Sequence, residues 1–291
     1  MKRLLLFFAF LFALMLGVVI ALVVVAVWRE DGALGGGERI GVVEVEGFIS
    51  DPTHVTTALR NLRAEDDIKA VVLQVNSPGG VIGPSQEIHD EVRRTAAVKP
   101  VVVAMGALAA SGGYYVSAPA TRIVANPGTA TGSIGVILQF KEVHLLFDKL
   151  GLRSQAVKSG AMKDAGSPFR EMTDADRATF QTLIDDLFDQ FVVAVAEGRK
   201  MDPQQVRQLA DGRVYSGRQA LELGLVDQLG NFWDAVAVAQ ELGGLTGEPK
   251  LDYRRKQHSG LLHWALGEDA SALEPLQAVA APAFRYALPS W

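Results

Sequence analysis

Short apolar runs alternate with amphipathic segments from residue 40 onward. The runs at 40–45, 70–75 and 101–105 are mostly β-branched and apolar, which is typical of strands buried on both faces of a parallel sheet. Between them, apolar residues recur at helical spacing, as they do in 53–64. This repeated strand–helix alternation predicts an α/β domain with right-handed crossovers and with its helices outside the sheet.

The same pattern predicts elements along the rest of the domain. Thr173, Asp202 and Ser216 are polar residues of the kind that cap helix N-termini, and Pro203 is suited to a first helical turn. We expect further strands at 121–125, 133–138 and 155–158, and helices at 84–97, 111–118, 143–150, 173–198, from 203, at 216–224 and at 231–242.

The N-terminal segment has a different pattern, because residues 4–28 contain no charged side chain. A helix of this length would extend about 37 Å, enough for a hydrocarbon core of about 30 Å. The apolar run is longer than that of a typical cleaved signal peptide, which is the alternative. The sequence therefore predicts a transmembrane signal anchor at 1–28. Lys2 and Arg3 favour a cytoplasmic N-terminus, with the remaining residues outside the cytoplasmic membrane.

Three further regions follow the anchor. Residues 29–39 are predicted to be a glycine-rich linker, 40–248 the folded domain, and 249–291 an apolar, proline-containing tail. The prolines interrupt a long helix in the tail, yet its composition is too apolar for a well-solvated segment. Two hypotheses remain: the tail packs as structural cover, or its apolar end lies near a substrate groove and competes with substrate.

The composition excludes several classes of function. All 33 acidic residues follow residue 28, as do all but two of the 28 basic ones, so the folded part is mildly acidic and nucleic acid is not the expected partner. The chain has no cysteine, which excludes disulfides, thiolate metal sites and a cysteine nucleophile. It also lacks a GxxxxGK[ST] phosphate loop and an HExxH zinc motif, and we expect neither metal nor cofactor.

Two glycine-containing loops directly follow predicted strands. Residues 76–80, Asn-Ser-Pro-Gly-Gly, could present backbone N–H groups to a developing negative charge, although a tight turn explains the same residues. Ser111 lies in Ala-Ser-Gly-Gly at a strand-to-helix junction, where it is either a nucleophile or an ordinary N-cap serine.

A nucleophilic serine needs a base, and the histidines are poorly placed for it. They lie in predicted surface helices or in the tail: His54, His89, His144, His258 and His263. Lys163 lies in a long loop, where burial would lower the pKa of a lysine amine and make it a base. The Ser133 hydroxyl, in Thr-Gly-Ser-Ile-Gly, could orient that amine. Taken separately, these two residues are also explained as a surface lysine and a turn serine.

In their order along the chain, these motifs resemble the signal peptide peptidase A family over about residues 40–240. The resemblance implies a ClpP/crotonase fold and a membrane-bound serine protease without a cofactor. It further implies remnant signal peptides as substrates and a cyclic homo-oligomer, with the catalytic pair either inside one chain or shared by two. By this similarity the catalytic roles fall to Ser111 as nucleophile, Lys163 as general base, Ser133 as the partner of the lysine, and Gly112 with Gly79 or Gly80 as the oxyanion hole.

Other functions share parts of this pattern. A related membrane protease cleaves stomatin-like proteins, a crotonase-type acyl-CoA hydratase or isomerase shares the fold and an oxyanion hole, and an inactive scaffold could share the fold alone. The Ser–Lys pair and the anchor favour the protease.

Overall fold

The computed structural model describes residues 7, 11–21, 37–255 and 285–287. The chain divides into two units, residues 1–38 and 39–291. In the first unit, residues 11–21 form a helix whose side chains are exposed. Within the described residues, no helix combines the length and apolarity needed to cross a bilayer. Much of the predicted anchor lies outside these residues, so a membrane-spanning segment stays a prediction.

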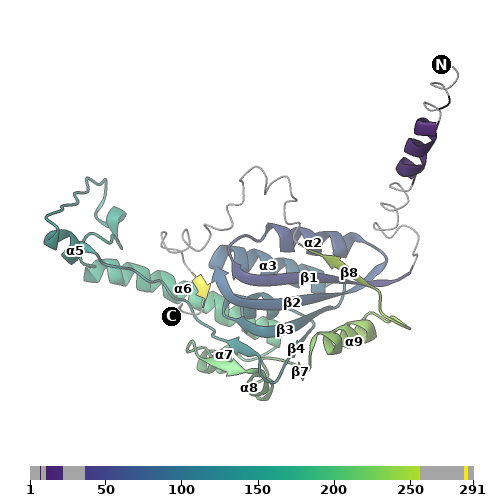
Figure 1. Ribbon diagram of the computed structural model, residues 1–291. Coiled ribbons are helices and arrows are strands. Elements are labelled where there is room, and N and C mark those ends of the chain that lie inside the picture. Colours follow the sequence, from purple (N-terminus) through teal and green to yellow (C-terminus); the bar gives the residue numbers. More distant parts are fainter. Residues whose placement is uncertain (1–6, 8–10, 22–36, 256–284, 288–291) are drawn as a thin grey trace. The chain divides into compact units, whose positions relative to one another are not determined.

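A nine-stranded sheet forms the centre of the second unit, and its middle strands are parallel. The central strands are β1 (Arg39–Ile49), β2 (Ile68–Val81) and β3 (Val101–Ala110), as Figure 1 shows. The sheet continues as β6-β5-β3-β2-β1-β8, while β4 pairs with both β3 and β7. The outer strands are β4 (Arg122–Ala125), β5 (Ala130–Gly132), β6 (Val214–Ser216), β7 (Gln228–Leu229) and β8 (Leu251–Arg254).

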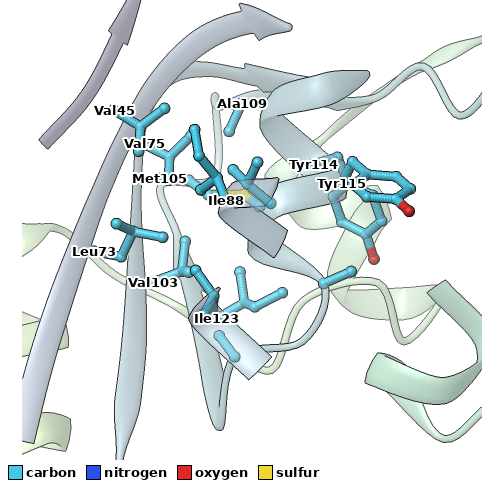
Figure 2. Packing of buried hydrophobic residues seen from close by; sticks show 14 of the residues in the cluster. Val45, Leu73, Val75, Ile88, Val103, Met105, Ala109, Tyr114, Tyr115 and Ile123 are labelled. Atoms are coloured by element: carbon cyan, nitrogen blue, oxygen red, sulfur yellow. The ribbon is translucent and has the colours of Figure 1, made fainter. Parts of the chain in front are cut away.

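Alternate residues of the strands face two hydrophobic cores, which explains why the strand sequences are apolar at nearly every position. One core holds Leu73 and Val103 and is covered by α2 (Thr53–Ala64) and α3 (Ile82–Ala96); Figure 2 shows part of it. The other core holds Val72 and Val102 and is covered by α9 (Phe232–Leu242). The predicted α/β architecture with helices on both faces of the sheet is therefore confirmed.

Polar caps fix the starts of the C-terminal helices as predicted. Thr173 and Ser216 form reciprocal capping boxes, and Asp202 accepts from two backbone N–H groups. The helices they begin are α6 (Asp174–Arg199), α7 (Pro203–Leu209) and α8 (Gly217–Glu222). Asn231 caps α9 in the same manner.

Two predicted strands are wrong. The strand expected at 133–138 lies instead at Ala130–Gly132, because Ser133 has a φ of 50° that turns the chain out of the sheet. The segment 155–158 is not a strand either: its Val157 is fully exposed, and no neighbouring strand pairs with it. Val157 is the one β-branched residue of this segment, and the described residues do not cover it.

Two strands of the sheet come from residues after the predicted domain boundary at 248. Strand β8 runs parallel to β1, with Ile40 opposite Leu251. Strand β9 (Arg285–Ala287) runs antiparallel to the end of β2, with Gly80 opposite Tyr286. Other parts of the predicted tail, including 260–266, lie outside the described residues.

Candidate active site

Ser111 has a strained backbone. It follows β3 and precedes the short helix α4 (Gly112–Ser117), with φ 53° and ψ −116°. This region is disfavoured for residues with a Cβ and costs on the order of 1–3 kcal/mol, so the surrounding contacts must enforce it. Its N–H donates to the carbonyl oxygen of Gly132 at 2.8 Å, and its carbonyl accepts from Tyr115 at 2.8 Å. The two bonds hold Ser111 between β5 and the first turn of α4.

Helix capping does not explain Ser111. Its side chain accepts no hydrogen bond from the N-terminal turn of α4. The helices that begin after Thr173, Asp202 and Ser216 do receive such bonds. Ser111 is 1% exposed, so its side chain lies at the edge of the core rather than in open solvent. The hydroxyl is thus left available for chemistry while the backbone is fixed.

Residues 76–80, which we call the glycine loop, were predicted to form a loop or tight turn after the strand, and this was wrong. They form the end of β2, because Gly79 and Gly80 resume the parallel pairing with β1 after an irregularity, and β2 contacts α4. A Cβ added at Gly113 would approach the Ser77 carbonyl oxygen to 2.7 Å, so only glycine permits this contact. The Ser77 hydroxyl donates to the Gly47 carbonyl oxygen at 2.6 Å and accepts from the Gly79 N–H at 3.1 Å. As the first residue of its helix, Gly112 has an N–H without an intrahelical acceptor. The structure therefore brings the Ser111–Gly113 turn and the glycine loop together.

Ser111 and Ser133 line one cavity of about 400 Å³. Ser133 is nearly buried, and its N–H donates to the Arg213 carbonyl oxygen at 2.8 Å. Most of the other lining side chains are apolar and come from the segment after β5 and from the middle of α6: Val136, Ile137, Ile184 and Phe188. Sequence patterns did not identify these apolar residues, because the middle of α6 meets Ser111 only through the tertiary fold.

Lys163 does not line this cavity. It lies in the 3₁₀ turn η1 (Ala161–Asp164), and its side chain is exposed. Salt bridges hold the turn, since Asp164 pairs with Lys158 at 2.5 Å and with Arg170 at 3.0 Å. The hydrogen bonds from Arg170 and Lys158 lower the pKa of the Asp164 carboxyl to about 2. The described part of the chain thus orders Lys163 without supplying the burial that a lysine base requires.

The segment that carries Lys163 has little core of its own. We call residues 138–172 the arm; it contains η1 and helix α5 (His144–Lys149), which Figure 1 shows at the end of α6 away from β1–β3. The ring of Phe140 packs on Phe180 of α6, with centroids 4.5 Å apart. Large apolar side chains are nevertheless exposed along the arm: Leu145, Leu146, Leu150, Leu152, Val157, Met162 and Phe169.

His89 is buried, contrary to the expectation of a surface position. It is 7% exposed and its ring lies 4.8 Å from that of Tyr115, because α3 packs this face on α4. Burial lowers the pKa of its imidazole. It lines a second cavity rather than the one beside Ser111, so it is not placed to act as the base.

Strand β9 lies beside the glycine loop. Its residues pair with Gly79, Gly80 and Val81, and β9 also contacts α4. An extended segment from near the C-terminus thus occupies the sheet edge next to the candidate oxyanion glycines. This main-chain pairing is how extended peptides commonly bind an exposed strand.

Comparison with known proteins gives two family matches. Residues 93–246, which include Ser111, Ser133 and Lys163, match peptidase family S49, and residues 42–131, which include the glycine loop, match the Clp protease family. An Enterococcus faecium protein provisionally named signal peptide peptidase SppA is 38% identical over 263 residues, covering 86% of this chain and 76% of that protein. A provisionally named protease of Synechocystis is 41% identical over 210 residues, covering 72% of this chain and 76% of that protein. Protease 4 of Salmonella typhi is 39% identical over 230 residues, and the match spans 79% of this chain but 36% of that longer protein.

Proposed function

Since this chain belongs to the signal peptide peptidase A family of the S49 peptidases, it is a serine peptidase, and we propose that it degrades remnant signal peptides with Ser111 as its nucleophile. The observation that carries the assignment is the strained backbone of Ser111, whose side chain caps no helix and lines a cavity. Strain of this kind is typical of functional residues. The family match includes this position.

In the proposed mechanism, Lys163 removes the hydroxyl proton of Ser111 as its oxygen attacks a peptide carbonyl. The N–H of Gly112, with that of Gly79 or Gly80, donates to the resulting oxyanion, and one such donor contributes about 3 kcal/mol. For Gly79 this requires its N–H to give up the bond to the Ser77 hydroxyl. The lysine then protonates the leaving amine, and water hydrolyses the acyl-enzyme. Ser133 lines the cavity with Ser111 and would accept or donate a hydrogen bond to orient the amine.

We further propose that Lys163 acts on Ser111 of a neighbouring copy in a cyclic homo-oligomer. Two observations support this arrangement: Lys163 is exposed and outside the Ser111 cavity, and the arm exposes large apolar side chains that lack cover in the described part of the chain. Docking the arm on a second copy would bury those side chains and desolvate the lysine. Burial of that kind favours the neutral amine, which is the form that accepts a proton.

The apolar part of the cavity lining, which also includes Asp185 and Asp211, supports an apolar peptide as substrate. Val136, Ile137 and Phe188 offer contacts to the uncharged side chains that dominate signal peptides. The uncharged segment 4–28 would anchor the enzyme in the cytoplasmic membrane, near such peptides, with the catalytic unit outside. No metal or cofactor takes part in the proposed reaction.

A fluorophosphonate probe tests the nucleophile directly. It should label the full-length protein at Ser111, and Ser111→Ala should abolish both labelling and peptide hydrolysis. Ser117→Ala is a matched control, because Ser117 lies at the other end of α4 and its hydroxyl donates to the Gly113 carbonyl oxygen. Labelling at a serine other than Ser111, or full activity in Ser111→Ala, would refute the assignment.

A further inference from the structure

A second cavity, of about 420 Å³, lies between α3, the turn after α4 and the C-terminal end of α6. We call it the basic pocket, and its charged lining residues are Arg93, Arg122, Glu197, Arg199, Lys200 and Asp227. It shares no lining residue with the cavity beside Ser111. The proposed peptidase mechanism therefore gives the basic pocket no role.

Arg199 is fixed at the wall of this pocket. Its side chain is only 6% exposed, and its Nη2 lies 2.7 Å from Oδ1 of Asp227. The other oxygen of Asp227 accepts the backbone N–H of Ile123 at 2.7 Å, which anchors the ion pair to β4. The guanidinium therefore has a defined orientation, and a rigid fork suits recognition of an oxyanion.

One donor of this guanidinium is unsatisfied. Nε of Arg199 is buried and has no hydrogen-bond acceptor among the residues that the structure describes. Buried donors are rarely left without an acceptor, because they lose their bonds to water. Because Nε has almost no accessible surface, an occupant of the pocket would bond the Arg199 guanidinium through its terminal nitrogens rather than through Nε.

The charge of the pocket favours an anion. Four cationic side chains face two carboxylates, and Asp227 is already bound to Arg199. The formal balance is thus two positive charges, since burial lowers the pKa of His89 and leaves that wall residue neutral at pH 7. Between the charged groups the lining is small and apolar, from Ala96, Pro119, Ala120 and Ala194.

We propose that the basic pocket binds a small phosphate monoester. Such a group carries nearly two negative charges at neutral pH and three acceptor oxygens. Its oxygens would accept from the guanidinium groups of Arg199 and Arg122, and its organic part would contact the apolar lining. A carboxylate of similar size matches the charge less well because it carries only one negative charge.

Titration calorimetry of the full-length protein with phenyl phosphate tests the proposal, with benzoate as the carboxylate comparison. Saturable binding of phenyl phosphate, at least about fivefold tighter than that of benzoate, is expected. Vesicles containing phosphatidic acid, tested in parallel, distinguish a lipid headgroup from a soluble ester as the source of the phosphate. Absence of saturable binding to both phosphate probes would overturn the proposal, as would equal affinity for benzoate.

Variants locate the site. Arg122→Gln and Arg199→Lys should each weaken phenyl phosphate binding on the order of tenfold, the first by removing a charge and the second by removing the planar guanidinium fork. Arg177→Gln is the matched control, because it removes one exposed positive charge from α6 outside the pocket. Thermal unfolding should be unchanged in Arg122→Gln, which excludes misfolding. If Arg122→Gln binds as tightly as Arg177→Gln, phosphate does not bind in this pocket.

Discussion

The sheet and the arm differ in how they hold their candidate catalytic residues. Ser111 is fixed by backbone hydrogen bonds from β5 and α4 and by glycine contacts inside a buried core. Lys163 is held in an exposed 3₁₀ turn by salt bridges to its neighbour Asp164, on a segment with many exposed apolar side chains. The contacts of Ser111 are all supplied by the second unit, whereas the arm has apolar surface that the described residues leave uncovered.

In the proposed oligomer, this contrast would correspond to a division of labour between subunits. A nucleophile must be placed to within a fraction of an ångström of an oxyanion hole, and a packed core provides that rigidity. A lysine base needs burial, and the arm would gain it only by docking on another surface. The proposed activity would then depend on assembly, because docking both orders the base and makes it neutral.

Mixing two inactive proteins is the most direct test of whether the serine and the lysine come from different copies. Ser111→Ala and Lys163→Ala should each lose activity by a factor on the order of 10³ or more, because nucleophile and base act as a unit. If the pair spans two copies, a mixture of the two variants should recover a sizeable fraction of the activity, since some interfaces join an intact serine to an intact lysine. The measurement is hydrolysis of a fluorogenic apolar peptide after subunit exchange.

Subunit exchange needs its own control. A mixture of Ser111→Ala with the double variant Ser111→Ala/Lys163→Ala should remain inactive. Exchange is verified by native mass spectrometry of proteins with different isotope labels. No recovery after verified exchange would place the serine and the lysine within one chain and remove the division of labour.

Leucines in the two regions should respond in opposite ways. Leu59 of α2 is fully buried, so Leu59→Ala should reduce the free energy of unfolding by about 2–5 kcal/mol. Leu146 and Leu150 of the arm are exposed, so Leu146→Ala/Leu150→Ala should change it by less than about 0.5 kcal/mol per residue in the isolated chain. The arm variant should instead weaken self-association and activity.

Denaturant unfolding and sedimentation velocity separate these two effects. Leu59→Ala should sediment as the wild-type oligomer at low temperature, although its unfolding midpoint is lower. If the double arm variant assembles as tightly as the wild type and remains active, the exposed leucines do not form the interface.

The difference between the sheet and the arm also explains which elements could be predicted from the sequence. The central strands and the capped helices were predicted because a buried parallel sheet and polar N-caps leave local patterns, as in 101–105 and at Thr173. The 155–158 segment was predicted to be a strand but lies on the arm, where none of the described strands pairs with it. The local sequence indicates that an apolar side chain prefers burial. It does not indicate whether the same chain buries that side chain.

Tertiary contacts account for the other differences. His89 has the polarity of a surface residue, and only the packing of α3 on α4 reveals that it is buried. Ser111 and residues 76–80 were both expected at strand ends, where open α/β sheets place their sites, and the close approach of Gly113 to Ser77 agrees with that expectation. The catalytic roles of Ser111, Ser133 and Lys163 stay predictions.

Removing the C-terminal segment tests whether the sheet region is also accessible to substrate. Truncation after Arg255 retains β8 but removes β9, which pairs with the sheet edge at Gly79–Val81. If β9 competes with substrate for that edge, KM for an apolar peptide should fall about threefold while kcat stays unchanged, because a larger fraction of sites is open. Steady-state kinetics of the truncated and full-length proteins measure this change.

The truncation also needs a control for the loss of chain length. The suitable control keeps the full tail but scrambles the sequence of 285–287. Substituting Gly80 itself is unsuitable, because Gly80 also packs against the backbone of Ile49 and its replacement would disturb β1. If truncation dissociates the oligomer or precipitates the protein, the tail is structural cover and the competition hypothesis is wrong.

The smallest expected effect concerns the salt bridges that order the arm. Arg170 and Lys158 lower the pKa of Asp164 to about 2 from its ordinary value of 3.8. Because the folded pKa is depressed, the bonds stabilise the folded arm above about pH 4, and this contribution is lost as the pH falls from 3.8 towards 2. Amide hydrogen exchange, corrected for its intrinsic rate, should therefore show protection at 160–170 decreasing over that range. The central strand 101–105 should stay protected there.

Two carboxylate variants show whether this pH dependence comes from Asp164. Asp164→Asn should lower the protection of 160–170 already at pH 5 and remove most of its dependence on pH, since the amide cannot ionise. Asp211→Asn removes a carboxylate that also pairs with an arginine, Arg213, but lies outside the arm, so protection of 160–170 should follow that of the wild type. Equal loss of protection in the arm and in 101–105 as the pH falls would mean that the two regions unfold together. In that case the arm is as much a part of the folded core as the strands that carry Ser111.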